Sequence, residues 1–214
     1  MRRISWAASV AALAVLALTA FAGSAPARRL RVNDQNYEWI WEGAAGRLRM
    51  STAGRTIACN ITLKGQFEAA SFEKVTTPAL ARITETVNPG AGECQSMMEE
   101  RFVALASTPW EVRYESFTGT LPNISSIIVR VIRGGFRLTL GTEVCDYPFE
   151  TNRYFRATIA VDGAGRLTSI TPDVARRIPS TSAGLVCRLE EATFENAGVV
   201  LRRETMSRIA LSLI

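Results

Sequence analysis

Residues 57–67, IACNITLKGQF, carry the clearest structural pattern in the chain. Apart from Gly65, apolar side chains recur at every second position; they are Ile57, Cys59, Ile61, Leu63 and Phe67. From position 60 on, polar side chains fill the positions between; they are Asn60, Thr62, Lys64 and Gln66. A period of two predicts a β-strand with one buried face. The glycine inside the run predicts a bulge or bend in that strand.

The same alternation returns further along the chain. It recurs at 109–117, at 154–161 and in the last residues, where Ile209, Leu211 and Leu213 share one face. We expect this last strand to pair within a sheet, because an apolar strand left unpaired is an aggregation hazard.

Turn residues separate these runs, and no segment shows the apolar period of a long helix. Asp162–Gly165 predicts a hairpin between two strands, and Gly134-Gly135 predicts another. We therefore expect an all-β fold, a single antiparallel β-sandwich or barrel-like domain of about ten strands that spans residues 37–214.

Residues 1–27 have the layout of a secretory signal peptide. Arg2-Arg3 precedes an uncharged, mostly apolar run at 4–22, and two A-x-A sites follow that end at Ala22 and Ala27. We expect cleavage after one of these two alanines, with Ala27 preferred.

Cleavage would export the remaining chain, to be secreted or held at the cell surface, with a flexible mature N-terminus at residues 28–36. The alternative is that the apolar run stays in the membrane as an uncleaved anchor, and only then is the membrane a partner.

The composition excludes several classes of protein. The chain has 214 residues, of which 47% are hydrophobic and 21% charged, which excludes a disordered chain. It contains no histidine, which excludes Ser-His-Asp and Cys-His catalysis and histidine-ligated zinc. The formal net charge is +5, and +3 once two arginines leave with the signal peptide. Because the charge is small and the arginines are spread along the sequence, we expect no nucleic-acid partner.

Four cysteines remain after the signal peptide: Cys59, Cys94, Cys145 and Cys187. An even number in an exported chain predicts two disulfides, for which three pairings exist. We favour Cys59–Cys94 and Cys145–Cys187, which close the shortest loops. The alternative is a zinc site, but the closely spaced cysteine pairs that zinc sites use are absent, so we expect neither a metal nor another cofactor.

Several blocks of the sequence resemble a group of uncharacterised secreted proteins of high-GC Gram-positive bacteria. They are IACNITLKGQF (57–67), Cys94, TPWEVRYESFTGTLPNISSI (108–127), EVCDY (143–147) and the final IALSLI (209–214). The group has no established activity. The resemblance implies export, disulfides and a β-rich domain, and it transfers no catalytic residue.

One set of residues is a candidate ligand site. Tyr37, Trp39 and Trp41 fall on one face of a strand, where three rings in a row would form a stacking platform for sugar rings or aromatic ligands. The alternative, which burial energetics favour, is that the rings pack in the core.

The function that best fits these features is non-catalytic. We expect an exported β domain that binds a cell-envelope component, a glycan or a protein. The first alternative is a secreted hydrolase that uses paired carboxylates, for which Glu111 and Glu115 share one face of a strand. The second is a structural envelope protein without a small-molecule site.

The signal-peptide analysis gives a direct prediction. Intact-mass measurement of the exported protein should show a chain that begins at Gly23 or Arg28, because cleavage follows an A-x-A site. Full-length chain in the membrane fraction would contradict it.

Overall fold

The computed structural model describes residues 29–41, 47–52, 55–76, 78–87, 94–95, 101–104, 109–120, 123–182, 184, 187, 191–202 and 205–213. The predicted signal peptide lies outside this part of the chain. Every regular element in the described ranges is a β-strand, so the all-β prediction is confirmed. Across these ranges, no helix has the length and apolar character needed to cross a membrane.

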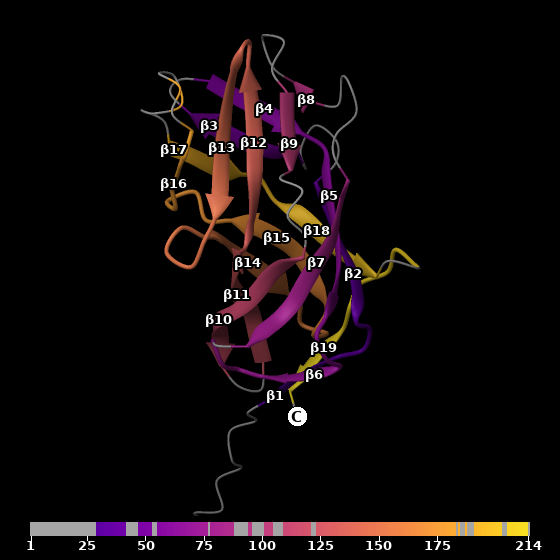
Figure 1. Ribbon diagram of the computed structural model, residues 1–214. Helices are drawn as coiled ribbons and strands as arrows, with labels where there is room; N and C mark the ends of the chain where they lie inside the picture. Colours follow the sequence, from indigo (N-terminus) through magenta and orange to yellow (C-terminus); the bar gives the residue numbers. More distant parts are fainter. Residues whose placement is uncertain are drawn as a thin grey trace, which may run out of the picture.

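Eight antiparallel strands form a closed barrel (Figure 1). β7 pairs with β10 to complete the ring, so that the barrel itself has no open sheet edge. Around the ring the strands are β10 (Trp110–Thr120), β11 (Asn123–Ile132), β14 (Phe155–Val161), β15 (Leu167–Pro172), β18 (Gly198–Arg202), β2 (Asn36–Trp41), β5 (Ile61–Phe67) and β7 (Ala79–Val87).

Two smaller sheets lie beyond one end of the barrel, at the top of Figure 1. The buried faces of the two sheets meet through Phe136 and Phe194, whose ring centroids are 4.9 Å apart, as in a β-sandwich. The first sheet has the order β13 (Glu143–Phe149), β12 (Gly134–Leu140) and β9 (Arg101–Ala104). The second has the order β16 (Ile178–Pro179), β17 (Glu191–Glu195), β3 (Leu48–Thr52), β4 (Arg55–Cys59) and β8 (Cys94–Gln95).

Some barrel strands run on directly into these sheets. Asn60 alone separates β4 from β5, and Arg133 alone separates β11 from β12. The run at 57–67, predicted as one strand, is therefore two strands in two sheets, although its alternation of burial continues across the break. Such breaks are one reason why the described residues form nineteen short strands and not about ten.

The hairpin predicted at Gly134-Gly135 is wrong, because both glycines belong to β12, which pairs with β13 and β9 and not with β11. Arg133 has a φ of 60° and turns the chain out of the barrel, and its N–H donates to the carbonyl of Phe149 at 2.7 Å. A Cβ on Gly134 would overlap the indole of Trp110. Close packing against that ring, and not a turn, requires the glycine there.

One other local prediction is confirmed, and a second is confirmed in position only. Asp162–Gly165 connects β14 and β15, which pair as an antiparallel hairpin. The β5–β7 register shifts between Lys64 and Gly65, but the extra residue is Thr84 of β7, because Lys64 pairs with Glu85 and Gly65 with Ile83. The bulge is therefore opposite the predicted glycine, in the partner strand and not in its own. A Cβ on Gly65 would overlap the carbonyl of Arg82 and the hydroxyl of Tyr37.

An aromatic cluster joins the barrel to the sheets above it. Trp110 of β10 meets Phe136 and Phe149 edge to face, at centroid distances of 5.7 and 5.8 Å. Phe155 of β14 stacks on Phe149 at 5.6 Å, and all four side chains are at most 3% exposed. The barrel and the sheets therefore share one buried core.

A three-stranded sheet lies at the opposite end of the barrel, with the order β19 (Leu211–Leu213), β1 (Arg29–Val32) and β6 (Ser71–Glu73) (Figure 1). The prediction of a flexible segment at 28–36 is wrong from Arg29 onward, because Leu30 and Val32 of β1 are buried between β19 and β6. Their alternation covers four residues, which is too short to distinguish a strand from a polar tail in the sequence. The predicted pairing of the last strand is confirmed by the β1–β19 ladder.

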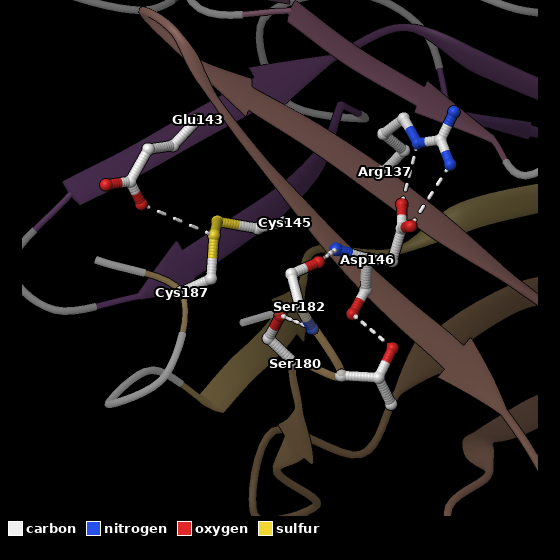
Figure 2. The surroundings of a disulfide bond; sticks show 8 residues. Arg137, Glu143, Cys145, Asp146, Ser180, Ser182 and Cys187 are labelled. Atoms are coloured by element: carbon white, nitrogen blue, oxygen red, sulfur yellow. Dashed lines mark hydrogen bonds and ion pairs between the residues drawn. A yellow bond between two sulfur atoms is a disulfide. The ribbon is translucent and has the colours of Figure 1, made fainter. Parts of the chain in front are cut away.

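The two disulfides confirm the favoured pairing. Cys59–Cys94 joins the neighbouring strands β4 and β8, and Cys145–Cys187 ties β13 to the segment before β17. Figure 2 shows the second bridge, where the Glu143 carboxylate lies 3.9 Å from the Cys187 sulfur. Disulfides of this kind indicate an oxidising environment.

The packing of Gly134 can be tested by substitution. Gly134→Ala should lower the free energy of unfolding by roughly 1–3 kcal/mol, because the added methyl must displace the Trp110 indole. Gly163→Ala is the matched control, since a Cβ there would meet nothing within 4 Å. Urea denaturation of both variants checks this, and equal midpoints would contradict it.

Reduction of the disulfides should lower the melting temperature sharply. Each bridge closes a loop of 35 or 42 residues, and loops of this length contribute about 3–4 kcal/mol on the chain-entropy model. Calorimetry with and without a reducing agent measures the shift, and thiol titration confirms reduction. An unchanged melting temperature with four titratable thiols would refute a stabilising role.

Candidate functional site

The aromatic residues considered as a ligand platform lie inside the barrel. Tyr37, Trp39 and Trp41 of β2 are 0%, 2% and 0% exposed. The Tyr37 hydroxyl donates to the carbonyl of Arg82 at 3.0 Å, and the Trp41 indole N–H donates to the carbonyl of Asn196 at 3.3 Å. Burial raises the pKa of the Tyr37 hydroxyl well above its ordinary value. The three rings pack the core, as burial energetics favour, and present no exposed face to a ligand.

The two carboxylates considered for hydrolysis are engaged in ion pairs. Glu111 and Glu115 both lie on the outer side of β10. Glu111 accepts from Arg113 at 2.7 Å through one oxygen and from Arg133 at 2.5 Å through the other. Glu115 accepts from Arg156 at 3.0 Å. The two carboxylates share one strand and so do not face each other across a cleft.

The outer side of the barrel carries a row of three arginines. The register places Arg113 of β10 opposite Arg130 of β11, and Arg130 opposite Arg156 of β14. Each arginine lies between two buried neighbours on its strand, so all three side chains leave the barrel on its outer side. Like charges directly opposite each other destabilise a sheet, so this row requires compensation or a ligand.

Arg113 is paired with Glu111 alone, whereas Arg156 is paired with two carboxylates. The Arg156 guanidinium donates to Asp173 at 2.9 Å and to both oxygens of Glu115 at 3.1 and 3.2 Å. The hydrogen bonds that Arg156 donates to Asp173 and then to Glu115 raise its pKa above the ordinary value. Arg156 is therefore the arginine of the row whose charge is most fully compensated by carboxylates.

Two nearby arginines have far less compensation. The closest ion pair of Arg130 is to Glu115, at 3.8 Å. Arg176, in the turn after β15, donates to the carbonyl of Asn152 at 3.4 Å. We call the five arginines of this surface the arginine face; they are Arg113, Arg130, Arg133, Arg156 and Arg176. The carboxylates that bind them within the described residues are Glu111, Glu115 and Asp173, so positive charge is in excess.

Arg137 is an example of a surface arginine that is fully paired with a carboxylate (Figure 2). It lies on β12, outside the arginine face, and donates to both oxygens of Asp146, at 2.7 and 3.1 Å. These bonds raise the pKa of Arg137. Arg130 and Arg176 have no such carboxylate partner among the described residues.

A groove of about 410 Å³ lies at the end of the barrel beside β19. Among the described residues that line it, Asp162 is the only charged one, and its pKa is lowered first by the hydrogen bond from the backbone N–H of Arg166. The carboxylate also accepts from the Arg166 guanidinium and the N–H of Ala164, so it is held within its own hairpin. The arginine face is the stronger candidate, because it has charged groups with unused donors.

Sequence reasoning missed this site because its arginines are scattered along the chain. The alternation at 109–117 and 154–161 does place Arg113 and Arg156 on polar faces of their strands. Their common row appears only when the strand order and register are known. The alternation at 154–161 also places Tyr154 on the polar face of its strand, but its position beside the arginine row depends on the same register.

No family model, curated protein or solved structure matches this chain. Across the described ranges, no three Cys, Asp or Glu residues gather in a way that could hold a metal ion. The function is therefore argued from the chemistry of the arginine face.

Proposed function

We propose that this protein is an exported, non-catalytic binding domain that holds an anionic polymer of the cell envelope against the arginine face. The observation that carries the proposal is the register-aligned row of Arg113, Arg130 and Arg156, which together with Arg133 and Arg176 sets five arginines against three neighbouring carboxylates. The two disulfides support a place of action outside the reducing cytoplasm.

The geometry of the sheet suits a linear ligand. Neighbouring strands are about 5 Å apart, so the row offers successive cationic groups at short, regular steps. Arginine suits this task because its planar fork of donors binds acidic oxygens in pairs. An extended polyanion that crosses the strands would meet these groups one after another, and several weak contacts would add up.

The proposal predicts selective binding of anionic polysaccharide. The protein should bind dextran sulfate and not neutral dextran, and binding should weaken as salt is added. The double variant Arg130→Gln/Arg176→Gln should weaken binding by at least about tenfold, because it removes charge-assisted contacts. Titration calorimetry at several salt concentrations measures both effects.

The matched control is Arg31→Gln/Arg49→Gln. It changes the net charge equally, and both residues are exposed and lie on β1 and β3, away from the arginine face. Equal weakening by the two double variants would show that net charge alone drives binding and would refute the proposal. Equal binding of charged and neutral dextran would also refute it.

A further inference from the structure

Two cations of the arginine face converge on one ring. The guanidinium carbon of Arg176 lies 3.8 Å from the ring centroid of Tyr154, and that of Arg130 lies 5.3 Å from it. The register explains the second contact, because Arg130 faces Arg156 and Tyr154 lies two residues before Arg156. Diagonal neighbours of this kind are within reach of long and aromatic side chains. Cation–π attraction holds both guanidinium groups at this ring.

An anchored turn presents Arg176. Asp173 accepts the backbone N–H of Ala175 through its side chain at 3.1 Å and that of Arg176 through its carbonyl at 3.0 Å. The other carboxylate oxygen of Asp173 accepts from Arg156 of β14 at 2.9 Å. The turn is thus tied to the barrel by a charge-assisted hydrogen bond. Arg176 therefore approaches Tyr154 from a backbone that is already fixed.

Both guanidinium groups keep donors without partners among the described residues. The Nε of Arg130 is buried, 3.8 Å from the nearest Glu115 oxygen, while the side chain is 26% exposed, so its terminal nitrogens are the donors that a ligand could reach. Arg176 makes one long hydrogen bond, at 3.4 Å, although a guanidinium carries five N–H donors. Two like charges on one ring, each with unused donors, form a site that a small oxyanion would complete.

We infer that Arg130, Tyr154 and Arg176 form a binding site for a phosphate group. This inference rests on the proposed function and specifies the charged group of the polymer that the arginine face would hold. A phosphate directs its oxygens to the corners of a tetrahedron, so separate oxygens can accept from the two guanidinium groups. A carboxylate has two oxygens in one plane, which match a single guanidinium fork.

The test is a titration of the full mature protein with three probes: inorganic phosphate, dimethyl phosphate and acetate. Binding is followed through the ring signals of Tyr154 in NMR spectra of tyrosine-labelled protein, assigned with Tyr154→Phe. We expect saturable shifts with both phosphates and at least tenfold weaker binding of acetate. Dimethyl phosphate represents the diester within a polymer, and inorganic phosphate represents the free ion.

Variants show whether the three residues form the site. Arg176→Gln, at an exposed turn, and Arg130→Gln should each weaken phosphate binding at least fivefold. Arg137→Gln, on β12, removes an arginine of the same charge and should leave binding within twofold. Unchanged binding in Arg176→Gln and Arg130→Gln, acetate binding equal to phosphate, or no saturable shift of Tyr154 would each overturn the inference.

Different experimental results would contradict the phosphate site and the proposed function. If dextran sulfate binds through the arginine face but phosphate leaves Tyr154 unshifted, the phosphate site is wrong and the function stands. If both phosphates bind at Tyr154 but no anionic polymer is retained, the proposed function is wrong. If inorganic phosphate binds and dimethyl phosphate does not, the site holds the free ion, and its link to a polymer is refuted.

Discussion

Closure of the eight-stranded sheet is the constraint on which the other features of this protein depend. β7 pairs with β10, so each barrel strand has a partner on both sides and its register is fixed by two neighbours. Fixed register determines which residues lie inside and which lie outside, because a slip by one residue would exchange the two faces. The buried rings of β2 and the outer arginines of β10, β11 and β14 are two results of the same alternation.

The hydrophobic core continues from the barrel into the upper sheets. Asn60 and Arg133 mark points where barrel strands leave the ring and continue into the sheets above it. The aromatic cluster around Phe136 and Phe149 fills the junction, so the two parts have one core. The disulfides lie in the upper sheets, where one joins the two-residue strand β8 to β4 and the other joins β13 to Cys187.

Much of this fold follows from local patterns in the sequence. Alternation predicts the strands and the cysteine order predicts the disulfides, because each depends on residues close in the chain or on short loops. The glycine in 57–67 marks the position of a bulge, but the extra residue lies on the partner strand β7. The breaks at Asn60 and Arg133 were not predictable, since the alternation of burial at 57–67 continues through Asn60 and the glycines after Arg133 resemble a turn. The arginine face was not predictable either, because residues 113, 130 and 156 meet only through a register that the whole barrel sets.

We propose the outer side of β10, β11 and β14 as the binding surface. Mapping backbone amide shifts in NMR spectra as an anionic polysaccharide is added tests it most directly. We expect shifts at Arg130, Tyr154 and Arg156 and at the turn around Arg176, with no change at the groove beside β19. Shifts confined to the residues of that groove, such as Asn123 and Ser212, would refute this assignment of the binding surface.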